Sequence, residues 1–350
     1  MKRFLIWLGL ATALYVQSAI PVPDIGNGRI RILGNNLQNY YYNYNESSRP
    51  SYHDDAGRAE KTHKIMEMML TTDADIYAFC EVEAKPIVLQ QLVDSLNQVV
   101  GTIRYAAVSD NINVATDSYD NAIKSGFIYR VDKVTPYGNN YAATNITYYK
   151  NVMRIQNWEE IRTGERFSLS MNHFKAMSDA ASIAKRVDNA RWLMSGLSSS
   201  TKVKDPDILI LGDLNAQMDE EAISIIQNSG FAEQLLRYNP DSYTYCYYGS
   251  EEIIDHVFAN SSMASQITGA AVWHVNTTCE YASNYYTRYS DHDPYLVAVN
   301  LGGELPEEEG FDSVTGNPSP LTRKILINGT LFIERAGQRY TLTGQLIEAQ

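Results

Sequence analysis

The chain contains little cysteine. Cys80, Cys246 and Cys279 are its three cysteines among 350 residues, too few for the disulfide framework of small secreted domains. They also lack the close paired spacing of structural zinc sites, which excludes a zinc-stabilised fold. Cys80 lies in an apolar, strand-like stretch and is predicted to be a buried thiol. Cys246 and Cys279 could pair in an oxidising compartment, and the sequence favours neither outcome.

Positive charge is scarce as well. The chain has 29 Lys and Arg residues against 41 Asp and Glu residues, which gives a formal net charge of −12. Such an acidic surface argues against tight, nonspecific binding of nucleic acid through the release of counterions. It does not exclude a nuclease, because bound cations and a local basic cleft can reverse the electrostatic field at one place.

Long hydrophobic runs are absent beyond the N-terminus. The first residues combine a basic start at Lys2 and Arg3, an apolar stretch from Phe4 to Val16, and the small residues Ser18 and Ala19. This pattern is typical of a secretory signal peptide over residues 1–19. The apolar stretch is shorter than the roughly 20 residues of a membrane-spanning helix. We therefore expect a secreted protein, extracellular, periplasmic or on the cell surface, with no membrane span.

A glycine-rich phosphate-binding loop is also missing, and two polar clusters at strand ends are present instead. The apolar stretch ILIL runs into Gly212, Asp213 and Asn215, and the cluster SDHDP (290–294) precedes the apolar stretch YLVAVNL. Asp213 and Asn215 are two residues apart and point to the same side of an extended chain. Hard oxygen ligands beside an imidazole suit metal-assisted phosphate chemistry. A turn-forming role for the Asp213 and Asn215 pair is the structural alternative.

Apolar periodicity predicts alternating strands and helices. Strands are expected at 30–33, 75–79, 126–130, 167–171, 208–212 and 253–258, and helices at 56–70, 86–99, 182–197 and 222–228. This alternation indicates an α/β domain, which we place at 24–301. A linker rich in glycine, proline and glutamate follows at 302–320. The remaining segment, 321–350, alternates as β-strands and is too small to bury a core alone.

The polar residues at strand ends occur in a recognisable order. They are Asn36, Glu81, His173, Asp213, Asn215, Asp255, Asp291 and His292, within the motifs FCEVE, NHFK, GDLN and SDHDP. With these motifs, the segment 29–301 resembles the endonuclease/exonuclease/phosphatase family of deoxyribonuclease-I-like phosphohydrolases. The resemblance implies a four-layered α/β sandwich, in which helices flank two packed, mainly antiparallel sheets and the active site lies at one rim.

The resemblance also implies a metal centre. Asn36, Glu81 and Asp291 match the residues that would hold Mg²⁺ or Mn²⁺, as one ion or two. Gln38 stands where many members carry an acidic residue, which weakens a second metal position. Asn35 is the competing assignment for Asn36. Glu83, next to the motif glutamate, is expected to face solvent.

Catalytic roles follow from the same resemblance. Asp213 would orient or deprotonate the attacking water, and Asn215 would donate hydrogen bonds to that water or to the phosphate. His292, held by Asp255, would be the catalytic histidine, and His173 would stabilise the phosphorane or protonate the leaving oxygen. Four further residues have weaker assignments: Lys175 to a phosphate oxygen or to solvent, Asp120 to the substrate or His173, His256 to a structural role, and Asp293 to a turn.

The substrate depends on the loops around the site, which are rich in tyrosine. The chain has 25 tyrosines, and exposed tyrosines can stack on bases without reading sequence, or can serve as half-buried packing or sugar-facing residues. We expect a metal-dependent nuclease or phosphodiesterase acting on nucleic acid, with no obligate protein partner. A phosphatase for small phosphomonoesters is the alternative, and a secreted binding protein with a degenerate site is a further one.

The C-terminal segment carries its own resemblance. LTRKILINGTLFIERAGQRYTLTGQ (321–345) is similar to the short tails that end many secreted proteins of the Bacteroidetes. Some of these tails are sorting signals for type IX secretion. A β-hairpin packed on the catalytic domain is the alternative for this segment.

Overall fold

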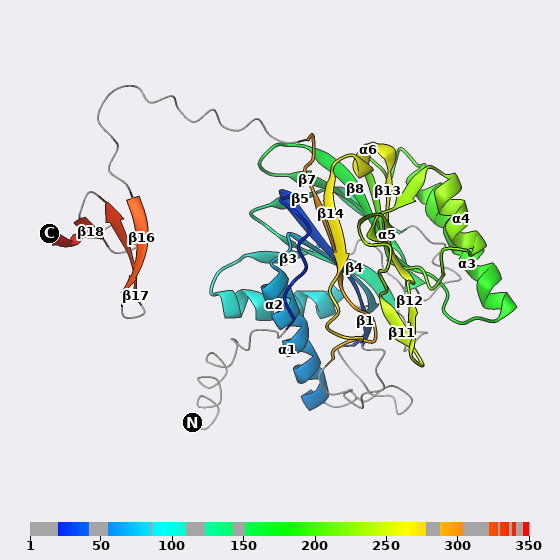
Figure 1. Ribbon diagram of the computed structural model, residues 1–350, viewed down its shortest axis with the longest axis horizontal. Helices are drawn as coiled ribbons and strands as arrows, with labels where there is room; N and C mark the ends of the chain where they lie inside the picture. Colours follow the sequence, from blue (N-terminus) through cyan, green and yellow to red (C-terminus); the bar gives the residue numbers. More distant parts are fainter. Residues whose placement is uncertain are drawn as a thin grey trace. The chain divides into compact units, whose positions relative to one another are not determined.

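The structure is a computed structural model. It describes residues 20–41, 55–84, 86–109, 123–142, 151–277 and 288–303, and the backbone of strands between 322 and 349 (Figure 1). The chain divides into two units, Met1–Glu304 and Leu305–Gln350. In the part of the chain that is described, no helix combines the length and apolar character needed to cross a bilayer.

Two β-sheets form the larger unit. The first has the order β14-β15-β1-β2-β4-β3, with β6 beside β4; the second has the order β10-β13-β9-β8-β7-β5. The strands of the first sheet are β1 (Ile30–Tyr40), β2 (Ile76–Glu83), β3 (Tyr105–Ala107), β4 (Ile123–Arg130), β6 (Asn151–Val152), β14 (Ile267–Val272) and β15 (Tyr295–Val299). Those of the second are β5 (Val134–Ala142), β7 (Arg154–Glu160), β8 (Arg166–His173), β9 (Ile208–Asp213), β10 (Phe231–Glu233) and β13 (Asp255–Asn260).

The central strands are apolar on both faces because both faces are buried. Along β2, Ala78 and Cys80 belong to the core between the two sheets, whereas Tyr77 and Phe79 belong to a second core under helices. This alternation follows from the two-residue period of a strand. Cys80 is a free, buried thiol, as predicted.

Helices cover the two outer faces. On the first sheet lie α1 (Asp55–Thr72) and α2 (Pro86–Val100); on the second lie α3 (Ala180–Leu197) and α4 (Glu221–Asn228). Figure 1 shows these two helix pairs on opposite sides of the sheets. Two one-turn helices, α5 (Leu235–Tyr238) and α6 (Ser261–Ala264), and a hairpin of β11 (Tyr245–Tyr247) and β12 (Ser250–Glu252) join the later strands. The expected four-layered α/β sandwich is therefore confirmed.

Strand direction brings the predicted site together. Most strand pairs are antiparallel, but β1 pairs with β2, β4 with β6, and β8 with β9, in parallel. Parallel strands end at the same edge, so Asn36 lies opposite Cys80, and His173 opposite Asp213. The antiparallel strand β13 begins at that edge, with Asp255 opposite Asp213.

The last strand of this unit lies inside its sheet and not at an edge. β15 pairs with β1 on one side and with β14 on the other, antiparallel to both. Every residue of β15 is buried. The strand therefore joins the N-terminal and C-terminal parts of the first sheet.

Gly212 explains why glycine precedes the acidic residue at the end of β9. Its φ is +151°, and a Cβ atom there would lie 2.3 Å from the carbonyl oxygen of Asn172 on β8. Gly212→Ala is expected to lower the free energy of unfolding by about 3 kcal/mol, through the clash and the disfavoured backbone. Urea unfolding would measure this loss. Gly101→Ala is the control, because Gly101 also has a positive φ but open space around it; equal losses would show that the clash contributes nothing.

The smaller unit is a four-stranded antiparallel sheet, β16-β17-β18-β19. Its strands are β16 (Thr322–Ile327), β17 (Thr330–Arg335), β18 (Gln338–Tyr340) and β19 (Leu346–Ala349). The β-structure expected for this segment is present.

Candidate active site

A buried carboxylate, Asp213, lies at the centre of the site. Its side chain is 1% exposed. The Oδ2 atom accepts a hydrogen bond from Asn36 Nδ2 at 2.9 Å and lies 3.6 Å from His173 Nε2 and 3.7 Å from His292 Nε2. Two imidazoles, one at the end of β8 and one in the segment before β15, therefore face one carboxylate oxygen. The amide N–H of Asn215 donates to the other oxygen, Oδ1, at 2.9 Å.

His292 is held through its second ring nitrogen. Its Nδ1 atom lies 2.6 Å from Oδ2 of the fully buried Asp255. Burial lowers the pKa of His292, but the nearby carboxylates, Asp255 foremost and then Asp213, outweigh it and raise the pKa well above its ordinary value. The imidazolium is consequently the favoured form at neutral pH.

The backbone around His292 is anchored to β1. Asn35 Nδ2 and Asn276 Nδ2 both donate to the carbonyl oxygen of His292, at 3.3 and 2.8 Å. Ser290 Oγ accepts from the amide of His292 and donates to the carbonyl oxygen of Asn36 at 2.5 Å. Asn35, the competitor of Asn36 in the sequence, thus positions the histidine.

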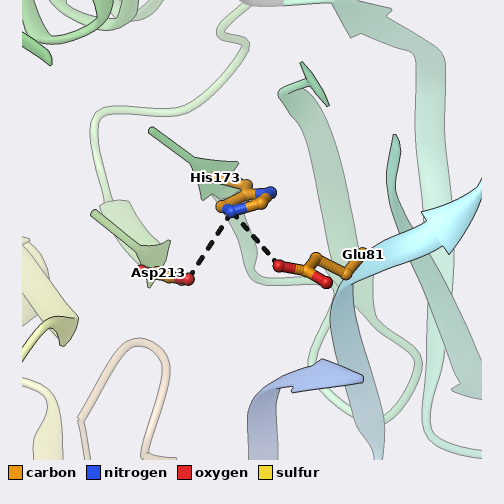
Figure 2. A group of neighbouring side chains, drawn as sticks. All are labelled: Glu81, His173 and Asp213. Carbon is orange, nitrogen blue, oxygen red and sulfur yellow. Dashed lines mark ion pairs between the residues drawn. The ribbon is translucent and has the colours of Figure 1, made fainter. Parts of the chain in front are cut away.

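Glu81 is aimed into the site by an irregular strand. Its φ is +54°, and the pairing of β2 shifts register here with both β1 and β4. Such bulges redirect side chains next to active sites. Figure 2 shows His173 between the Glu81 and Asp213 carboxylates; Nε2 lies 3.5 Å from Glu81 Oε1. Asn36 Nδ2 and the amide of Asn39 also donate to Glu81, at 3.1 and 2.9 Å.

Four non-glycine residues of the site have left-handed backbones. They are Gln38, Asn39, Glu81 and Asn215, with φ values of 46°, 56°, 54° and 47°. This conformation is uncommon outside glycine, and each instance costs about 1–3 kcal/mol. Strain of this kind persists only where the surrounding packing imposes it. The site is therefore held rigidly by the two sheets beneath it.

Sequence reasoning missed Lys61. This α1 residue is 1% exposed, and its Nζ donates to the carbonyl oxygen of Gln38 at 2.6 Å. Burial lowers the pKa of Lys61 to about 7, against the opposing effects of Asp291 and Glu81. One signal could have revealed it: Lys61 lies four and eight residues before the buried Ile65 and Met69, on the apolar face of the helix.

A family model described as the endonuclease/exonuclease/phosphatase family matches residues 36–292. The chain belongs to the endonuclease/exonuclease/phosphatase family. Members are divalent-metal-dependent phosphoric ester hydrolases, so this chain is an enzyme of that class. The match begins at Asn36 and ends at His292, which are the first and last residues of the site. Among curated proteins, none matches the sequence significantly.

Solved structures share the family fold. An endonuclease/exonuclease/phosphatase family protein from Bacteroides thetaiotaomicron is 16% identical, with a TM-score of 0.53 over 77% of this chain and 96% of that one. The mannosyl-6-phosphatase of the same organism is 16% identical, with a TM-score of 0.51 over 77% and 99%. D. rerio TDP2 complexed with a single-strand DNA product is 14% identical, with a TM-score of 0.50 over 77% and 98%. At these identities, the likeness establishes the fold alone.

The acidic residues of this family member fit a divalent cation. Burial raises the pKa of Asp291, the nearby His292 lowers it and Glu81 raises it, so the negative charges of Asp291 and Glu81 repel each other. A cation between them would relieve that repulsion, and carboxylate oxygens suit Mg²⁺ or Mn²⁺. Two triplets have atoms close enough to hold an ion, Glu81–His173–Asp213 and Asp213–Asp255–His292. The second triplet is already engaged in the short His292–Asp255 hydrogen bond.

Asn36 and Asn215 hydrogen-bond to other residues of the site. The Oδ1 atom of Asn36 accepts from the amide of Gln38 at 2.8 Å, which turns its Nδ2 towards Glu81 and Asp213. In this arrangement Asn36 positions the two carboxylates, and its expected role as a metal ligand stays a prediction. Asn215 Nδ2 donates to the carbonyl oxygen of Phe174 at 3.3 Å, and its amide completes the turn with Asp213.

Three other residues had been assigned roles from the sequence. Lys175 is partly exposed, two residues beyond His173, and Asp120 lies outside the described residues. His256 is fully buried, with Nε2 2.9 Å from the carbonyl oxygen of Ala216, which agrees with a structural role.

Two acidic residues were misjudged. Glu83, expected to face solvent, is buried because β2 continues through it and pairs with β4. Asp293 is more than a turn residue, since its Oδ1 accepts from the amides of residues 275–277 and its Oδ2 lies 2.8 Å from His274 Nδ1.

Proposed function

We propose that this enzyme is a secreted nuclease or phosphodiesterase that hydrolyses phosphodiester bonds by in-line attack of water. The observation that carries the proposal is the placement of two imidazoles and the Glu81 carboxylate around Asp213, with Asp291 4.0 Å from His292 Nε2. An acceptor for a water proton and donors for phosphate oxygens then lie within one buried cluster. This arrangement also argues against a degenerate binding protein, because each group retains the partners that orient it.

The distances around Asp213 suggest how these groups act. The two Nε2 atoms lie 3.6 and 3.7 Å from Asp213 Oδ2, beyond the usual 2.7–3.2 Å of a hydrogen bond. Neither imidazole is saturated by the carboxylate, so both can turn to a phosphate. His292, favoured as the cation, would neutralise charge on a phosphate oxygen, and His173 would serve the leaving oxygen. Asp213 would accept the proton of the attacking water.

Glu81 and Asp291 would hold Mg²⁺ or Mn²⁺, which supplies charge neutralisation on the phosphate oxygens when bound. EDTA is expected to abolish hydrolysis, and Glu81→Gln to raise the metal concentration needed for half-maximal rate by about 10–100-fold. Titrating Mn²⁺ in an activity assay, and separately by electron paramagnetic resonance without substrate, would measure this. Glu83→Gln is the control on the same strand and should leave the metal requirement unchanged. Full activity in EDTA would contradict the metal assignment.

The choice of a phosphodiester rests on the aromatic surroundings. Tyr247 and Tyr248 are exposed on the hairpin that follows Thr244, and the structurally similar D. rerio TDP2 was solved with a single-strand DNA product. Net charge −12 and the similar mannosyl-6-phosphatase favour the second candidate, a phosphatase for small phosphomonoesters. Plasmid DNA, single-stranded RNA and a phosphomonoester panel, assayed side by side with metal, separate the two. Phosphate release from a monoester with nucleic acid uncut would overturn the nuclease proposal.

Two features support export. Residues 1–19 have the composition of a signal peptide, and Cys246 is disulfide-bonded, which is typical of oxidising compartments. Cys279 lies outside the described residues.

We further propose that the C-terminal sheet is a sorting signal. Deleting residues 321–350 should leave the protein inside the producing cells, and unchanged localisation would remove this proposal.

A further inference from the structure

We infer that the β11–β12 hairpin is a substrate-binding arm whose tyrosines stack on an unpaired nucleobase beside the scissile phosphate. This inference rests on the proposed nuclease function and specifies its substrate as single-stranded nucleic acid. The tyrosine arm comprises Tyr245, Tyr247 and Tyr248, and four observations on the molecule point to its role.

The base of the arm is attached to the catalytic residues. Tyr245 forms a β-bridge with His292, and their ring centroids are 4.8 Å apart. The neighbouring Thr244 accepts the amide of Asp255 on its Oγ1 at 3.0 Å and the amide of Asp293 on its carbonyl oxygen at 2.8 Å. The first ring of the arm therefore lies directly beside the imidazole that would face the phosphate.

From there the rings run outward in a row. Tyr245 and Tyr247 are nearly parallel, with an interplanar angle of 16° and centroids 6.4 Å apart. Tyr248 meets Tyr247 edge to face at 4.5 Å. The exposed fraction reaches 54% at Tyr247 and 73% at Tyr248. Such exposed rings stack on any base, since every base has a π-face.

The turn of the hairpin holds Tyr248 in an unfavourable backbone conformation. Tyr248 and Gly249 are the two loop residues, with φ values of 48° and 85°. Two-residue turns with both φ values positive favour asparagine, aspartate or glycine. A tyrosine there is strained, and its ring is mostly in solvent. Backbone strain at a residue whose ring is mostly exposed favours a ligand-binding role for that ring.

A disulfide bond constrains the arm, and the strand opposite its tyrosines is acidic. Cys246, between the two parallel rings, is disulfide-bonded, which lowers the entropy that would be lost on binding. The opposite strand carries Glu251 and Glu252, which disfavour phosphates beside the arm and leave the faces of the bases as its contacts. The arm therefore suits the faces of unpaired bases, and a duplex would both hide those faces and bring added negative charge.

Binding without turnover tests this inference apart from the proposed function. Fluorescence anisotropy in EDTA would measure the Kd of the purified protein for a labelled 12-residue oligothymidylate and for an abasic oligomer of equal length. We expect wild type to bind the base-containing strand about tenfold more tightly. The double variant Tyr247→Ala/Tyr248→Ala should lose this preference, whereas Tyr247→Phe/Tyr248→Phe should retain it. Tyr137→Ala, which removes a partly exposed tyrosine from β5, is the matched control and should bind as wild type.

The possible results test base binding by the arm and the proposed nuclease activity separately. Equal binding of both oligomers by wild type, or an unchanged preference in the double alanine variant, would overturn the inference. Failure of wild type to bind either oligomer would overturn it as well. Preferential binding through the arm, without cleavage when Mg²⁺ or Mn²⁺ is added, would support the arm and contradict the proposed nuclease. Thermal unfolding of the alanine variant checks that the hairpin change leaves the domain folded, and the phenylalanine variant tests stacking independently.

Discussion

His292→Ala is expected to lower kcat by about a thousandfold, the upper end of the range for removing a group that stabilises charge in the transition state. His292 faces Asp213 through Nε2 and is held by Asp255 through Nδ1 at 2.6 Å. Its backbone is anchored independently of the ring by Asn35, Asn276 and Ser290. Truncation should therefore remove the imidazole without displacing the loop. Steady-state kinetics on the best phosphoester substrate would measure the loss.

His274→Ala is the matched control. His274 is also a histidine paired with a buried aspartate, Asp293, with Nδ1 2.8 Å from Oδ2. It stacks on Tyr243 outside the Asp213 cluster. Its removal should change kcat by less than a few-fold. If both variants lost activity equally, the loss would reflect disruption of the loop, and the catalytic role of His292 would be rejected.

Asp213→Asn is expected to lower kcat by a similar factor, about a thousandfold, and to change the pH profile. The amide keeps the shape of the side chain but cannot accept the water proton. Asp213 is also one of the carboxylates that raise the pKa of His292. Activity that needs the imidazolium declines as pH rises through this pKa. With Asp213 neutralised, the pKa falls, and the alkaline decline should move to lower pH.

The pH dependence distinguishes catalysis from structure. A variant that merely loosened the site would lose rate without moving the alkaline limb in a defined direction. Measuring the residual kcat between pH 5 and 10, with a thermal melt at each pH, provides both readouts. A limb that stayed in place or moved to higher pH would show that Asp213 does not face His292 during the reaction.

Much of the fold was predictable because buried strands reveal themselves by apolar runs. ILIL before Asp213 and YLVAV after His292 became β9 and β15. The edge of the second sheet was not predictable. β5 contains Pro136 and Gly138, residues that an edge strand tolerates but that normally argue against a strand. β7 buries polar residues among apolar ones, which hides its alternation.

The candidate site was predictable in membership but not in arrangement. Polar residues at the ends of apolar strands have no structural reason to be there, so they could be found without coordinates. Their partners could not, because Asn36 contacts Asp213 across 177 residues of sequence. Lys61 was missed since a single lysine on an apolar helix face resembles an interruption of the pattern. The left-handed backbone conformations of Glu81 and Asn215 could not be predicted either, because neither position is a glycine.

The interior position of β15 sets the order in which this enzyme can fold. The strand is the last of the larger unit to emerge from the ribosome, yet β1 and β14 cannot be joined without it. Contacts between segments this far apart in the sequence form slowly, because the intervening chain must lose conformational entropy before the contacts form. A nascent chain that lacks residues 291–299 therefore has neither a complete first sheet nor a catalytic histidine. Hydrolytic activity is therefore expected only after β15 has joined β1 and β14.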